Sequence, residues 1–129
     1  MIDSILTSIK TILGIEEEDT AFDQELIAHI NSVLISLTQL GIGPADGFLI
    51  TSDVETWQDF IGDNKMKRGL VETFVGLKVR LVFDPPMNAT AVEAIKETVK
   101  ELEFRLYIIE NPKNIFEKVE GENDDNTSI

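Results

Sequence analysis

The 129-residue chain contains no cysteine and only one histidine, His29. Without thiols, the sequence excludes a disulfide framework, a thiol nucleophile and a thiolate metal site. His29 has no second histidine at ligand spacing, so we expect a structural role for it at the edge of an apolar helix stripe. Glycine-rich phosphate loops and nucleophile motifs are also missing. From these absences we predict no enzymatic activity, no cofactor and no metal.

Long apolar runs are missing as well, and the first residues do not combine a basic segment with an apolar one. We therefore expect neither a membrane span nor a signal peptide, and a protein that stays in the cytoplasm where it is made. The length is typical of a single domain.

Basic residues are scarce in the first half of the chain. The first 64 residues contain twelve acidic residues and one basic residue, Lys10, and the whole chain has a formal net charge of −13. This balance disfavours binding to the outside of DNA through phosphate neutralisation. An acidic surface could keep the protein soluble, mimic DNA, or line a channel that must not grip DNA. Lys65, Lys67 and Arg68 form the one basic cluster, which could face carboxylates or a phosphate.

Apolar periodicity predicts two helices in the first third of the chain. The first begins at a cap provided by Asp3 or Ser4 and ends at Gly14 in the left-handed conformation. The second begins at a capping box of Thr20 and Asp23 and is stopped by a glycine in the same way. The acidic run between them, residues 16–19, would benefit from the dipole at a helix entrance. It has neither the alternating oxygen ligands nor the glycine of a calcium loop.

The middle of the chain is predicted to be a loop followed by a short helix. Residues 48–50 are an apolar trio, long enough for a loop or at most a short strand. Asp53 can cap a short helix that contains Trp57. We expect this tryptophan to anchor the loop against the core.

Residues 69–106 form the segment around which the chain is organised. Its first part is apolar nearly all round, which requires burial inside the domain or between subunits. This helix should end near Phe83, because Asp84-Pro85-Pro86 cannot continue it. A second helix begins at Asn88 or Thr90, and the short link makes the pair an antiparallel hairpin. The apolar seam of the second helix consists of Val92, Ile95, Val99, Leu102, Leu106 and Ile109.

The predicted fold is therefore mainly α, a small domain of four to five helices over residues 1–110 with a flexible tail over residues 111–129. The tail is polar and acidic, which is typical of disorder. Its sizeable apolar residues, at a spacing that one helical turn could present, are Ile115, Phe116 and Val119. A tail of this kind can become ordered on contact with a partner.

Seven short segments together resemble the head–tail connector (adaptor) proteins of long-tailed double-stranded DNA phages and prophages. The resemblance covers roughly residues 5–110. Its most specific parts are Phe83-Asp84-Pro85-Pro86, which ends a matching segment that begins at Val79, and Glu101-Leu102-Glu103-Phe104-Arg105-Leu106. The other segments are Leu13-Gly14-Ile15, Asp19-Thr20-Ala21-Phe22-Asp23, Ile30-Asn31-Ser32-Val33, Leu37 to Pro44, and Thr56-Trp57.

The resemblance implies a helical subunit that forms a ring, expected to be a dodecamer, beneath the portal of a filled capsid. Such a ring extends the DNA channel, lets DNA pass without specific binding, and docks the stopper or tail-completion protein. It belongs to the virion at the head–tail junction and is assembled in the host cytoplasm. For the arm that binds the portal or a neighbouring subunit we predict Ile115, Phe116 and Val119. For subunit contact we predict Phe104, Tyr107 and Ile108, which lie off the apolar seam. The candidate channel-facing charges are Glu16, Glu17, Glu18 and Asp19.

Two other functions are compatible with the composition. An acidic DNA mimic that inhibits a nucleic-acid enzyme would be a monomer or dimer, and its binding to a basic protein would be sensitive to salt. A DNA-packaging accessory would bind nucleic acid, with Lys65, Lys67 and Arg68 as its phosphate contacts.

Overall fold

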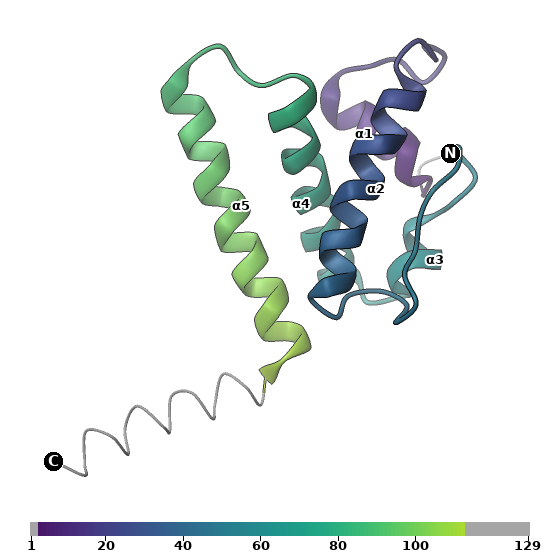
Figure 1. The fold of residues 1–129 in the computed structure, drawn as a ribbon, viewed down its shortest axis with the longest axis vertical. Coiled ribbons are helices and arrows are strands. Elements are labelled where there is room, and N and C mark those ends of the chain that lie inside the picture. Colours follow the sequence, from purple (N-terminus) through teal and green to yellow (C-terminus); the bar gives the residue numbers. More distant parts are fainter. Residues whose placement is uncertain (1–2, 113–129) are drawn as a thin grey trace, which may run out of the picture.

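The computed structural model describes residues 3–112, and these form a small, mainly α-helical domain (Figure 1). Its elements are α1 (Ile5–Leu13), α2 (Asp23–Gln39), α3 (Trp57–Ile61), α4 (Lys65–Phe83) and α5 (Ala89–Glu110). No strand occurs in residues 3–112, and the predicted strand-or-loop segment 48–50 is a loop. None of the helices in this range is long and apolar enough to span a bilayer. The fold class is confirmed, while the division into domain and tail at residue 110 stays a prediction.

Helix α4 lies at the centre of the domain and contacts each of the other four helices. In Figure 1, α2 and α5 flank it on its two sides. Its buried side chains are Val71, Phe74, Val75 and Val79. One face of this apolar segment is thus buried within the domain, which was one of the two predicted possibilities, while Val82 near its end is 62% exposed.

Helices α4 and α5 form the predicted antiparallel hairpin. Helix α4 ends at Phe83, because the following Asp84-Pro85-Pro86 cannot extend it. Asn88 is the N-cap of α5, and its Oδ1 accepts a hydrogen bond from the Thr90 backbone N–H at 2.7 Å. The buried residues of the α5 seam are Val99, Leu102 and Leu106.

Helix α1 begins and ends as predicted. The Ser4 hydroxyl accepts a hydrogen bond from the Thr7 backbone N–H at 3.2 Å. Gly14 has a φ of 77°, and the N–H of the next residue, Ile15, donates to the Lys10 carbonyl at 2.8 Å. This pattern closes the last turn and satisfies carbonyls that the helix leaves open.

The predicted capping box at the start of α2 is wrong. Phe22 is the N-cap residue and provides no side-chain hydrogen bond. The Asp23 carboxylate instead binds the ammonium group of Lys10, with Nζ and Oδ1 2.9 Å apart. Lys10 is only 3% exposed, so an ion pair between α1 and α2 outcompetes the local motif.

The predicted cap of the short helix is also wrong, because Asp53 does not cap α3. Thr56 is the N-cap, and its hydroxyl accepts from the Asp59 N–H at 3.1 Å. The Asp59 carboxylate accepts in return from the Thr56 N–H at 3.2 Å, which completes a capping box.

Glu55 shapes the turn that precedes α3. Its carboxylate accepts hydrogen bonds from the N–H and hydroxyl of Thr51, at 2.9 and 2.7 Å, and from the N–H of Ser52 at 3.2 Å. Partial burial acts to raise the pKa of the Glu55 carboxyl, but these hydrogen bonds favour the anion, and the pKa lies below its ordinary value. The Glu55 carbonyl also accepts from the Ile5 N–H, so the turn is tied to α1.

Trp57 anchors this turn to the core, as predicted. Its side chain is fully buried, and its indole Nε1–H donates to the Ser8 hydroxyl at 2.7 Å. Its backbone N–H donates to the Asp3 carbonyl at 3.1 Å. The loop between α2 and α3 is therefore fastened at its far end.

Candidate interaction surface

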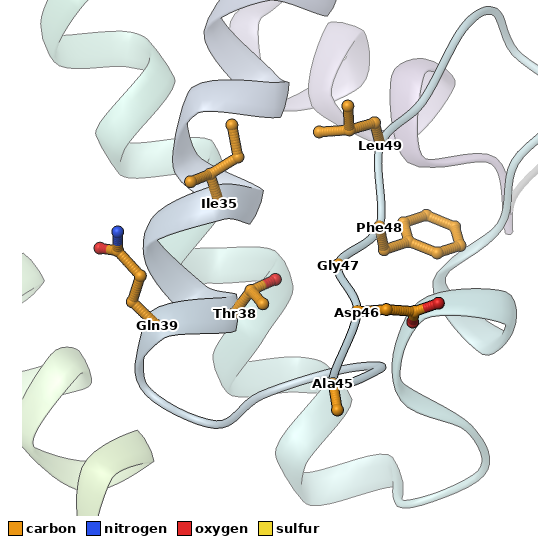
Figure 2. Close-up of a pocket in the computed structure, with 8 residues that line it drawn as sticks. All are labelled: Ile35, Thr38, Gln39, Ala45, Asp46, Gly47, Phe48 and Leu49. Carbon is orange, nitrogen blue, oxygen red and sulfur yellow. The ribbon is translucent and has the colours of Figure 1, made fainter.

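The loop that follows α2 runs back beside that helix and leaves an open apolar pocket between them (Figure 2). We call it the α2–loop pocket, and its volume is about 580 Å³. It is lined by Ile35, Thr38, Gln39, Ala45, Asp46, Gly47, Phe48 and Leu49.

Two contacts hold the loop wall of this pocket in place. The Asn31 side-chain amide on α2 donates to the Ile50 carbonyl at 2.9 Å and accepts from the Ile50 N–H at 2.7 Å. The Phe48 ring packs on Phe60 of α3 with centroids 5.3 Å apart. Gly43 permits this packing: its φ is 85°, and a Cβ there would lie 2.4 Å from the Phe60 ring. The pocket is therefore preformed.

The chemistry of the α2–loop pocket suits an apolar partner. Ile35 and Leu49 are 50% and 53% exposed, and both side chains border the opening between helix and loop in Figure 2. The single charged lining residue is Asp46, whose carboxylate points away from α2 at the rim. Apolar surface of this kind with a polar rim is typical of protein interaction sites.

A second pocket lies between the end of α2 and the outer face of α5. We call it the α5 pocket; its volume is about 290 Å³, and Leu40, Lys100, Glu103, Phe104 and Tyr107 line it. Phe104 is 57% exposed. The structure thus brings together two of the predicted contact residues, Phe104 and Tyr107. Ile108 is half-buried and is not part of this lining.

The acidic run Glu16–Asp19 is exposed in the connection between α1 and α2. This connection lies at the end of the domain opposite the loop that follows α2 (Figure 1). The Lys10 ammonium donates to the Glu17 carbonyl at 2.9 Å, which fixes the backbone of the run. Among residues 3–112, no group of three acidic, histidine or cysteine side chains is arranged to hold a metal ion.

The basic cluster at the start of α4 is largely paired within the chain. Lys67 forms an ion pair with Glu110, and Arg68 forms one with Asp3. Lys65 is exposed. Since two of the three cations already have carboxylate partners, the cluster is poorly suited to bind phosphates.

The remaining predictions concern the arm and the single histidine. Ile115, Phe116 and Val119, the predicted arm, lie outside the described residues. His29 is half-buried on α2, at the edge of the core.

The α2–loop pocket was not predicted from the sequence. Its one signal was Ile35, an apolar residue of α2 outside the stripe that the helix buries. The other wall depends on the pairing of Asn31 with Ile50, nineteen residues apart, which no local pattern reveals.

Searches among curated proteins and among solved structures return no match. The family model of the phage connector protein matches residues 5–113, which is most of the chain. The matched range contains both pockets, the acidic run and all five helices. This chain therefore belongs to the phage connector protein family.

Proposed function

We propose that this chain is the subunit of a ring, expected to be a dodecamer, that lies beneath the portal of a phage head. The ring would extend the DNA channel and dock the stopper or tail-completion protein. The observation that carries the proposal is the family match over residues 5–113. Membership gives a structural head–tail connector role, a place in the virion and association with other phage head and tail proteins. Ring closure, the particular partners and assembly in the host cytoplasm are the proposed part.

Subunit contact is assigned to the outer face of α5. Phe104 is more than half exposed, and with Tyr107 it borders an apolar pocket, whereas a helix that packs only inside its own domain leaves its outer face polar. Ile108 extends the same stretch of helix. A ring contact is head-to-tail, so these side chains would meet a different surface on the next subunit.

The channel wall is assigned to the acidic run. Glu16, Glu17, Glu18 and Asp19 are exposed on a chain of net charge −13. A negative wall repels the DNA backbone and lets it slide past without being held. The arm residues Ile115, Phe116 and Val119 would become ordered on the portal or on a neighbouring subunit.

Deleting the coding sequence from the phage or prophage that encodes it tests this function. We expect DNA-filled heads and free tails that fail to join, with joining restored when the wild-type protein is supplied. Electron microscopy of lysates and plaque counts measure the outcome. Normal tailed particles in the deletion strain would contradict the connector function.

A further inference from the structure

The α2–loop pocket exposes apolar surface on walls that are already fixed. Ile35 and Leu49 are each about half exposed, while Asn31 holds the loop through two hydrogen bonds to Ile50. A preformed apolar pocket binds a matching group with little cost of ordering. A volume of about 580 Å³ admits more than one apolar side chain.

The chain itself contains a segment of this chemistry beyond α5. Residues 113–119 read Lys-Asn-Ile-Phe-Glu-Lys-Val. Ile115, Phe116 and Val119 have the spacing of one helical face, the pattern by which short amphipathic segments bind grooves. Residues 113–119 also contain Lys113, Glu117 and Lys118, a formal net charge of +1, and the sequence is strongly acidic from residue 120 onward. Apolar anchors at this spacing complement the apolar opening between Ile35 and Leu49.

The point from which this segment leaves the domain is fixed. Glu110, the last residue of α5, forms an ion pair with Lys67 at the start of α4. In Figure 1 this end of α5 and the loop that follows α2 lie toward the same end of the domain. The anchors begin three residues after Pro112, so Ile115 to Val119 reach at most about 10–25 Å from it. In the proposed ring, an arm of that reach would meet a subunit packed against this end of the domain.

We infer that Ile115, Phe116 and Val119 of one subunit occupy the α2–loop pocket of the adjacent subunit. The inference rests on the proposed ring and names an acceptor for its arm. Donor and acceptor are different surfaces of the same chain, as a head-to-tail contact that closes a ring requires. Each subunit then gives and receives one arm, and the second contact between two neighbours forms at high effective concentration.

The absence of cysteine from the chain permits a clean cross-linking test. One full-length variant has Leu49→Cys, another has Phe116→Cys, and the two are mixed, assembled with purified portal and mildly oxidised. Because each chain has a single thiol, a disulfide between the two variants reports an arm on a neighbour's pocket. The control mixture combines Met87→Cys with Phe116→Cys. We expect the Leu49→Cys mixture to give at least about tenfold more mixed dimer than this control, because thiols held together react at millimolar effective concentration. Met87 is fully exposed in the α4–α5 connection.

Ile35→Cys replaces Leu49→Cys as a second reporter in the opposite wall of the pocket, in case one variant folds poorly. Mixed dimers from both reporters, but not from the Met87 control, are the expected result. If rings assemble on the portal and neither reporter exceeds the control, the pocket assignment is wrong and the proposed function is unaffected. A chain that carries both Leu49→Cys and Phe116→Cys is also tested. If its disulfide forms only within one chain, the inference that the arm binds a neighbouring subunit is wrong. If no ring assembles with portal at all, both the inference and the proposed function fail.

Discussion

Lys10 shows how one side chain can determine the entrance of a helix. It is the only base in the first 64 residues, and it is buried between the Asp23 carboxylate and the Glu17 carbonyl, each 2.9 Å from its Nζ. Truncating the Lys10 side chain would remove the ammonium donor from the partly buried Asp23 carboxylate and from the Glu17 carbonyl.

We expect Lys10→Ala to lower the free energy of unfolding by about 1.5–3 kcal/mol, the usual range for hydrogen bonds to charged groups. Lys96→Ala is the matched control, because its ion pair with Glu93 is exposed and should contribute less than about 0.5 kcal/mol. Urea unfolding measures both. Equal losses from the two variants would show that the buried pair has no special role.

Gly43 and Gly41 provide a second comparison between a test position and its control. Both have φ near 85–89°, so alanine costs about 1–2 kcal/mol at either position. Only at Gly43 would the new Cβ overlap a side chain, the Phe60 ring. Gly43→Ala should therefore destabilise the domain by about a further 1–3 kcal/mol, as overpacking does. Urea unfolding of both variants tests it, and equal costs would show that the loop wall is free to move.

At the scale of the element, α5 presents two faces that differ in burial. Leu106 is fully buried, whereas Phe104 is 57% exposed at the α5 pocket. We expect Leu106→Ala to cost about 2–5 kcal/mol of stability, as large-to-small core substitutions do. Phe104→Ala should change stability by less than about 0.5 kcal/mol and still reduce ring assembly, measured by sedimentation with portal. Normal assembly of a folded Phe104→Ala chain would remove this face from the subunit contact.

Elements and packing faces were largely predictable from sequence, and long-range contacts were not. The spacing of apolar residues along α2, α4 and α5 predicted helices, and Asp84-Pro85-Pro86 predicted where α4 ends. The Thr20–Asp23 capping box failed because Asp23 has a stronger partner in Lys10, thirteen residues away. The α2–loop pocket was missed for the same physical reason, since the bonds between Asn31 and Ile50 build one of its walls.

At the scale of the whole molecule, the charge is unevenly distributed, with twelve acidic residues and one basic residue in the first 64 positions. Replacing Glu16, Glu17, Glu18 and Asp19 by their amides removes four charges from the proposed channel wall. We expect DNA ejection from phage with this variant to slow, because a less negative wall repels DNA less. The control makes the same change at Asp84, Glu93, Glu97 and Glu101. Unchanged ejection kinetics in the first variant, or equal slowing in both, would contradict the assignment of the acidic run to the channel.

The central claim is that this chain assembles as a connector, and its mass in solution tests that claim most directly. Light scattering should be measured on the purified full-length protein, alone and mixed with portal from the same phage. We predict either a ring, with a mass several times the 14.4 kDa of one chain, or a stoichiometric complex that forms only with portal. A 14.4 kDa monomer that portal leaves unchanged would contradict the connector account.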